Sequence, residues 1–486
     1  MKRGRAGRSR SDANRRRGTP KAAAIRRQCD KRLGMTSDDQ GQDAVVAARR
    51  ELRESRARVL ELHRRGLDAR QVCGRLTSLV DVMVGRLFEA ALQKLHDEQA
   101  DALQGNVAFV ALGSYGRRQL APFSDVDLMI LKGRCKEEDI EALAQTFLTS
   151  MYDLGLQLGQ SVRTPAQAVG RARTDAIICS SMIDGRLAAG NQRLFEDFRD
   201  QFKKMTSRRS KSLARAFHEA RAQERRQYGE SVYLLEPNVK RSRGALRDLN
   251  LLRWLGFVEH GESDPDRLLL LGAVSKFEHH RLASAQDYLL RLRNELHFHA
   301  GSARESLDRA EQLRIAKVYG HRHRAGLLPV EHFMRDYFRH TGFVWQIVRR
   351  REASLDVASS TLTKMLDPVF GRKVEGDYHV GVRDIAATPS GLVKLRGNLA
   401  EVLRLVEMAS RKSKSLDQAT WSALLLAAPD CPAEVDRDVC RRFLDILAEP
   451  ASVGSSLRTL HELGYLEKVV PAMQHARCLL QFNQYH

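Results

Sequence analysis

A chain of 486 residues is too long for one hydrophobic core, and typical domain sizes suggest roughly two to four units. Its hydrophobic share of 43% and charged share of 29% are those of a soluble globular protein, and they exclude large-scale disorder. No stretch approaches the roughly 18 to 20 apolar residues that span a bilayer, and no apolar signal core follows the basic N-terminus. We therefore expect a cytoplasmic protein without a membrane segment.

The net charge of +21 is concentrated at the N-terminus, where residues 1–34 hold thirteen Lys or Arg against two Asp. Such an Arg-rich segment cannot bury apolar surface, so a disordered basic tail is predicted over residues 1–40. It is either a solvated tail or a wrongly assigned start with initiation at Met35, and the remaining alternative is a nucleic-acid tether. Nucleic-acid binding is otherwise not expected.

The seven cysteines lie far apart in the sequence, without a CxxC pair and without histidines at metal-binding spacing. This pattern predicts reduced thiols, mostly buried, and no zinc site.

Helical and strand patterns alternate in the first 190 residues. Apolar spacing of three and four predicts two helices over 43–104, with a break near Gly66. The following segments predict, in order, a strand over 107–112, a strand over 126–131, a helix over 137–154, a strand over 156–162 and a helix opened by Thr164-Pro165. These elements build a small mixed sheet with helices packed on it.

After about Ala188 the strand signals almost vanish. Amphipathic segments predict helices over 193–228, 245–260, 274–299, 310–319, 330–350, 392–409, 421–428, 437–447 and 456–463. One exception is 370–382, which is typical of a hairpin around Gly376-Asp377. The fold class predicted is α+β, mainly helical. Expected domains are N-terminal helices over 41–104, a catalytic domain over 105–188, a helical domain over 189–360 and a helical region over 361–486.

The stretch VALGSYGRRQLAPFSDVDLMIL, residues 110–131, carries the chemistry. A strand ends at Leu112 and the chain turns at Gly113-Ser114, where glycine allows a close backbone approach to a ligand. The serine hydroxyl and the backbone N–H groups of the next helix can bind a phosphate. Arg117 and Arg118 can add positive charge beside it.

Asp125 and Asp127 stand two residues apart at the head of the second strand, so both project from one face while Val126, Leu128 and Ile130 point into the core. Carboxylates about 6 to 7 Å apart repel each other unless a cation lies between them. The pattern therefore predicts Mg²⁺, which proteins hold with one or two carboxylates completed by substrate phosphates and water.

This combination resembles the polymerase-β-like nucleotidyltransferase motif, a G-[GS] turn followed by D-x-D. The resemblance implies a catalytic domain of that fold, with Asp125 and Asp127 as catalytic residues and Mg²⁺ ligands. A third acidic residue is expected from a later strand, but LGLQLGQSVRTP (154–165) offers only Gln157 and Gln160. Asp153 or Asp248 completes the site, or the site is weakened or inactive; these alternatives stay open.

Further segments resemble the PII uridylyltransferases, the bifunctional uridylyltransferase/uridylyl-removing enzymes. They are GSYGRRQLAPFSDVDLMIL, GQSVRTP with Gln160 in place of histidine, YLLEPNVKRSRGALRDLNLLRWL with Ala245 in place of a glycine, RNELHFHAGSARESL, VEHFMRDYFRHT and the terminal LHELGYLEKVVPAMQHARCLLQFNQYH. The matches extend from about residue 105 to the end.

The resemblance implies transfer of UMP from UTP to a tyrosine of the nitrogen-signalling protein PII, with release of pyrophosphate. The residues implied to bind the nucleotide are Gly113, Ser114, Tyr115, Gly116, Arg117, Ser124, Lys240 and Arg247. In that family an HD phosphohydrolase domain and two ACT domains follow. The sequence ends before both, so uridylyl removal and glutamine sensing are not expected, and the chain is either a gene fragment or works with another chain.

Two alternatives remain at this stage. One is adenylyl transfer to glutamine synthetase or another protein, because nothing in the motif reads the base. The other is a catalytically silent scaffold that holds PII or, through the basic tail, nucleic acid.

Outside the motif, Lys240, Arg241, Arg243 and Arg247 precede a helix start and could close over the phosphates, or form a solvated basic loop. His297 and His299 are two apart on a predicted helix and therefore face different sides, which argues against a shared metal.

Overall fold

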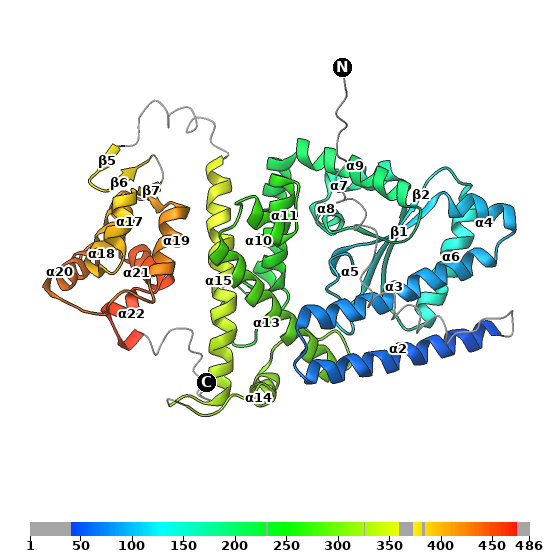
Figure 1. The fold of residues 1–486 in the computed structure, drawn as a ribbon, viewed down its shortest axis with the longest axis horizontal. Coiled ribbons are helices and arrows are strands. Elements are labelled where there is room, and N and C mark those ends of the chain that lie inside the picture. Colours follow the sequence, from blue (N-terminus) through cyan, green and yellow to red (C-terminus); the bar gives the residue numbers. More distant parts are fainter. Residues whose placement is uncertain (1–39, 230–231, 325, 359–372, 382–383, 474–486) are drawn as a thin grey trace, which may run out of the picture. The chain divides into compact units, whose positions relative to one another are not determined.

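A computed structural model describes residues 40–229, 232–324, 326–358, 373–381 and 384–473 (Figure 1). The chain divides into two compact units. Among the described residues, the first unit contains 40–206 and 297–303, and the second contains 207–296 and the residues from 304 onward. The predicted basic tail lies outside the described residues, as do Cys29 and Cys478.

The first unit is built on a four-stranded sheet with the strand order β3-β2-β1-β4. Strand β1 pairs antiparallel with β2 and β4, whereas β2 pairs parallel with β3. Its elements are α2 (Gln40–Arg64), α3 (Ala69–Gln93), α4 (Asp97–Gln104), β1 (Val107–Ala111), α5 (Gly113–Gly116), β2 (Val126–Lys132), α6 (Glu137–Asp153), β3 (Leu158–Arg163), α7 (Pro165–Thr174), α8 (Ala176–Ile183), β4 (Arg186–Gly190) and α9 (Gln192–Arg208).

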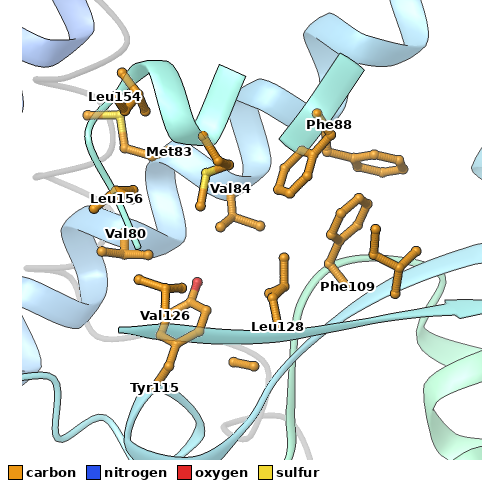
Figure 2. Packing of buried hydrophobic residues seen from close by; sticks show 14 of the residues in the cluster. Val80, Met83, Val84, Phe88, Phe109, Tyr115, Val126, Leu128, Leu154 and Leu156 are labelled. Carbon is orange, nitrogen blue, oxygen red and sulfur yellow. The ribbon is translucent and has the colours of Figure 1, made fainter. Parts of the chain in front are cut away.

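One face of this sheet packs against helices α3 and α6. Phe109 of β1 lies between Phe88 of α3 and Phe147 of α6, with ring centroids 4.9 and 4.5 Å apart. Val126, Leu128 and Ile130 of β2 belong to the same buried cluster. Figure 2 shows the first two of them beside Tyr115 and Phe109. The alternation predicted for β2 is therefore confirmed, since these three residues face the core.

Most of the predicted elements of this unit are present. The break near Gly66 is real, with φ of +84° at this glycine, but the segment predicted as two helices forms three, α2, α3 and α4. Helix α7 begins as expected, because the Thr164 side chain and Gln167 form a reciprocal capping box ahead of Pro165. Strand β4 was missed: the catalytic domain was expected to end at residue 188, which falls inside this strand. Its sequence RLAAG has a single bulky apolar residue, so it carries little strand signal.

The second unit begins with a helical body. Its elements are α10 (Ser210–Gln227), α11 (Leu246–His260), α12 (Pro265–Leu270), α13 (Lys276–Ala300), α14 (Arg309–Val318) and α15 (Pro329–Ala358), of which the last turn of α13 is counted with the first unit. The single helix expected over 193–228 is two helices, α9 and α10, that meet at Arg209.

The C-terminal part of the second unit combines a small sheet with helices. The expected hairpin is present as β5 and β6 around Gly376-Asp377, and β7 and β8 extend it in the order β5-β6-β7-β8. The elements are β5 (Lys373–Glu375), β6 (Tyr378–Val380), β7 (Asp384–Ala387), α17 (Pro389–Leu395), α18 (Leu399–Arg411), β8 (Ser415–Leu416), α19 (Gln418–Ala427), α20 (Arg437–Leu447), α21 (Val453–Leu463) and α22 (Leu466–Val469). Strands β7 and β8 were not predicted; they have four and two residues.

The fold class predicted from the sequence, α+β and mainly helical, is confirmed. Among the described residues, no helix is long and apolar enough to cross a membrane.

Candidate active site

Asp127 lies in a slot whose two sides are glycines. A Cβ atom added to Gly113 would lie 2.8 Å from Asp127 Oδ2, and one added to Gly159 would lie 2.5 Å from Asp127 Oδ1. Real Cβ atoms do not approach oxygen this closely, so the carboxylate occupies the space that side chains at these two positions would need. The Gly113 turn and strand β3 thus both border the carboxylate.

The sheet register produces this slot. Parallel pairing of β2 with β3 sets Asp127 opposite Gly159. On the other side, the Leu112 N–H donates to the Asp127 carbonyl at 2.9 Å, which fixes the end of β1 and the turn that follows. Gly113 has φ of +53°, in the left-handed region that glycine adopts most easily.

Asp125 precedes β2 and is exposed. The Val126 N–H donates to the carbonyl of Gln157, the residue before β3, at 2.8 Å. The pairing of β2 with β3 therefore begins at the residue that follows Asp125. Since Val126 is buried in the core, we expect Asp125 to project from the opposite face, as Asp127 does. Ser124 closes the turn before it: its Oγ accepts from the Ala121 N–H at 3.2 Å.

The Gly113-Ser114 turn continues into the single helical turn α5. Ser114 is half-buried, and its carbonyl accepts from the Gln119 N–H at 2.8 Å. Gly116 has a packing reason to be glycine, because a Cβ atom there would lie 2.4 Å from the Asp184 carbonyl oxygen. Close packing at Gly116 and the left-handed backbone at Gly113 together hold the turn against the strands.

Two side chains expected near a phosphate, those of Tyr115 and Arg117, instead make buried contacts within the first unit. Tyr115 is fully buried, and Figure 2 shows its ring with the core residues of β2, so only its backbone can contact a nucleotide. Burial raises the pKa of the Tyr115 hydroxyl well above its ordinary value, and the nearby Asp81 carboxylate acts in the same direction. The Arg117 guanidinium forms a buried ion pair with Asp184 at 3.2 Å.

Arg118, also expected beside the phosphate, has φ of +59° and turns toward helix α3. Its guanidinium donates to Ser78 Oγ at 2.6 Å and pairs with Asp81 at 3.4 Å. Neither Asp184 nor Asp81 was singled out from the sequence, because each lies more than 35 residues from its arginine.

The two acidic residues considered as a third carboxylate differ in their surroundings. Asp153 is the exposed last residue of α6. Asp248 is fully buried in the second unit, where its Oδ1 accepts from Arg221 Nε at 2.7 Å and its Oδ2 from the Gly244 N–H at 2.7 Å. Both Asp248 oxygens therefore hold the second unit together, which leaves them poorly suited to bind a metal.

Lys240 and Arg247 belong to the second unit, in the loop before α11 and in its first turn. Asn238 Oδ1 accepts from the Lys240 N–H at 3.0 Å and the Arg241 N–H at 2.8 Å, which fixes the loop. Lys240 Nζ lies 3.7 Å from Glu305, and Arg247 Nε lies 3.9 Å from Glu224. Burial lowers the pKa of Lys240 to about 8, helped by the neighbouring Arg293 guanidinium and opposed by Glu305.

A pH prediction follows from the lowered pKa of Lys240. In the unfolded chain this lysine keeps its proton up to its ordinary pKa of 10.5, but the folded protein releases it near pH 8. Between these values the unfolded state binds more protons, so Lys240 makes the free energy of unfolding increase with pH. We expect Lys240→Met to be more stable than the parent at pH 7, and this difference to shrink as the pH rises from 8 to 10.

Urea unfolding at several pH values checks this prediction. The matched control is Lys211→Met, at an exposed lysine of α10 in the same unit. Its difference from the parent in free energy of unfolding should not change with pH. If Lys240→Met and the parent differed by the same free energy of unfolding at every pH from 7 to 10, the lowered pKa would be contradicted.

The residues around Asp127 fit a magnesium ion. Carboxylate oxygens are the ligands Mg²⁺ takes from proteins, and its other ligands are water and substrate phosphates. The described residues contain no group of three or more His, Cys, Asp or Glu placed to hold a metal by themselves. A site of one or two carboxylates that a nucleotide completes is consistent with both observations.

Gly159 was not singled out from the sequence, and it gives a sharp test of the slot. Gly159→Ala places a methyl group 2.5 Å from Asp127 Oδ1, so the carboxylate must move. Displacing a reacting group by about 1 Å can lower a reaction rate about 100-fold. We therefore expect the rate of the nucleotidyl transfer predicted from the sequence to fall about 10- to 100-fold. Stability should change little, because the carboxylate is the flexible end of a side chain.

The measurement is the transfer rate together with thermal unfolding. Gly170→Ala is the matched control, since nothing lies within 4 Å of a Cβ atom there and the residue is inside helix α7. Unchanged transfer by Gly159→Ala would show that the position of the Asp127 carboxylate does not matter.

His297 and His299 behave as their spacing predicted. His297 is fully buried, and its Nδ1 accepts from the Phe123 N–H at 3.3 Å, whereas His299 is exposed. They do not share a site.

Comparisons with known proteins match both parts of the chain. Residues 53–164 match the model described as putative nucleotidyltransferase DUF294, and residues 212–350 match the model described as GlnD PII-uridylyltransferase. The first region contains the Gly113 turn, Asp125, Asp127 and Gly159, and the second contains Lys240, Gly244 and Arg247.

Curated relatives agree with these family models. The chain is 31% identical to a bifunctional uridylyltransferase/uridylyl-removing enzyme of Ruegeria pomeroyi, over 86% of this chain and 46% of the relative. Enzymes of the same description from Caulobacter vibrioides and Methylococcus capsulatus are each 29% identical, over 85% and 91% of this chain and 45% and 50% of their own lengths. The chain thus spans about half the length of the curated relatives it matches.

Proposed function

We propose that this chain, whose sequence is similar to the bifunctional uridylyltransferase/uridylyl-removing enzymes, transfers UMP from UTP to a tyrosine of a PII-type protein. The observation that carries the proposal is the Asp127 carboxylate held between the Gly113 turn and Gly159. A carboxylate beside a phosphate-binding turn is the arrangement that nucleotidyl transfer requires. The choice of UMP and of a PII-type acceptor rests on the description of the matching family and the names of the relatives.

In the proposed reaction the acceptor tyrosine oxygen forms a bond to the α-phosphorus of UTP. The bond from that phosphorus to the bridging oxygen breaks, pyrophosphate leaves, and the tyrosine proton passes to solvent. Asp127, with Asp125, would hold the Mg²⁺. The ion would supply neutralisation of the charge that develops on the α-phosphate and the departing pyrophosphate.

The chain's own groups orient the substrate. The Ser114 hydroxyl and the N–H groups at the start of α5 would donate hydrogen bonds to phosphate oxygens. The buried Arg117–Asp184 ion pair would hold the Gly113-Ser114 turn in position without contacting the substrate. In the second unit, Lys240 and Arg247 are proposed to bind phosphate oxygens, because burial lowers the pKa of both groups and an anion would stabilise their charged forms.

The test is incubation with a PII-type protein, Mg²⁺ and either UTP or ATP, followed by intact-mass measurement of the acceptor. A mass increase corresponding to UMP on one tyrosine, with UTP clearly preferred to ATP, supports the proposal. A preference for ATP would point to adenylyl transfer. Nucleotide binding without turnover, rescued by Gln157→Glu beside the metal face, would identify a silent scaffold that lacks its third carboxylate.

A further inference from the structure

The second unit contains a cavity whose lining includes none of the residues proposed above to act in UMP transfer. Its volume is about 1140 Å³, and both the helical body and the C-terminal helices of the unit line it. Drug-sized ligands occupy pockets of roughly 300 to 1000 Å³, so this cavity is large enough for a whole nucleotide.

Aromatic side chains form one wall of this cavity. Tyr233 is 45% exposed and meets the buried Phe338 edge to face, with ring centroids 5.2 Å apart. Phe343 and Trp345 continue the wall along helix α15. A half-exposed tyrosine backed by a buried ring is a firm surface on which a planar base can stack.

Guanidinium groups stand against these rings. The Arg281 guanidinium lies 4.9 Å from the Phe343 ring centroid, and the Arg243 guanidinium lies 4.8 Å from that of Trp345. Such cation–π contacts hold the planar group in place beside the cavity. Guanidinium donors match phosphate oxygens in geometry and charge.

The charge of the lining is strongly positive. Five arginines and one lysine line the cavity, against two glutamates. Glu462 pairs with Arg349 at 2.8 Å, yet burial still raises the pKa of the Glu462 carboxyl. With four more Arg and Lys than Glu side chains in its lining, the cavity attracts an anionic ligand.

We propose that this cavity binds a nucleotide, with the base on the Tyr233 wall and the phosphates at Arg243 and Arg281. An aliphatic anion would leave the aromatic wall unused, and a neutral ring would leave the excess positive charge unbalanced. The lining of the cavity shares no residue with the Asp127 slot, and the inference does not depend on the proposed UMP transfer.

The probe is ADP with EDTA present, because removing divalent metal prevents metal-dependent binding at Asp127. Calorimetry on the full chain should show one saturable ADP site, and tripolyphosphate, which lacks a base, should bind at least about tenfold more weakly. Trp345 is one of three tryptophans, so ADP should quench fluorescence in the parent and quench it less in Trp345→Phe. Equal binding of tripolyphosphate would overturn the nucleotide assignment.

Variants locate the site. Tyr233→Ala and Arg281→Gln should each weaken ADP binding about tenfold, and Arg281→Lys should restore part of it. Arg441→Gln, an exposed arginine of α20 paired with Asp438, is the matched control and should bind ADP as the parent does. Asp127→Asn should also bind ADP as the parent does. Failure of ADP to bind the parent, or unchanged binding by both Tyr233→Ala and Arg281→Gln, would overturn the proposal, whether or not UMP transfer is observed.

Discussion

Asp127→Asn is expected to lower the rate of UMP transfer by at least about 100-fold while the protein stays folded. Removing a residue that only supports a metal ligand costs about 10- to 100-fold, and Asp127 is proposed to be a ligand itself. The change keeps the size of the side chain, so the glycine slot remains filled. What it removes is the negative charge and one of the two oxygens that border Gly113 and Gly159.

The measurement is the initial rate at saturating UTP, with circular dichroism to confirm folding. Asp125→Asn should lose activity in the same way, because the two carboxylates are proposed to share the ion. Asp101→Asn, an exposed aspartate of α4 in the same unit, is the matched control for loss of one negative charge. Full activity of both Asp127→Asn and Asp125→Asn would refute the enzyme assignment.

Gly244→Ala should destabilise the second unit by about 3 kcal/mol or more, because two costs combine. Gly244 has φ of +72°, where a side chain strains the backbone. A Cβ atom there would also lie 1.9 Å from the carbonyl oxygen of Thr341. Thr341 is fully buried inside helix α15, so its backbone cannot retreat without disturbing that helix.

Urea unfolding followed by tryptophan fluorescence measures this effect, since Trp254, Trp345 and Trp421 all lie in the second unit. Gly272→Ala is the matched control: its φ is +70°, but nothing lies within 4 Å of a Cβ atom. The free energy of unfolding of Gly272→Ala should fall by only about 1 to 2 kcal/mol, which is the cost of placing a side chain in the left-handed conformation. Equal losses in the two variants would mean that Gly244 does not approach Thr341 closely.

The neighbouring position has no such restriction. Ala245, where the resemblance described above would place a glycine, has φ of −82°, which any residue adopts. Its Cβ atom is buried without needing the left-handed region. Of the two adjacent positions, only Gly244 is restricted by its backbone.

Local patterns predicted most of the fold and the centre of the site. The apolar runs of β1 and β2, the turn between them and the facing of Val126 and Leu128 are all consequences of short-range sequence. Strand β4 escaped prediction because its pairing with β1, rather than its own residues, makes it a strand.

The surroundings of the site could not be predicted, because they depend on contacts between distant residues. Gly159 borders Asp127 only through the parallel register of β2 and β3. Arg117, expected beside a phosphate, pairs instead with Asp184, 67 residues later. Asp248, considered as a third carboxylate, is held by Arg221 and the Gly244 N–H, and no local pattern reveals that pairing.

The loop that carries Lys240 is already ordered before a substrate arrives. Asn238 anchors two of its N–H groups, Arg221 donates to its carbonyls, and the close approach at Gly244 holds it against α15. Its conformational entropy is therefore lost when the chain folds rather than when phosphate binds. For the phosphate binding proposed at Lys240, the rigid loop would therefore add its charge to the affinity without an ordering cost.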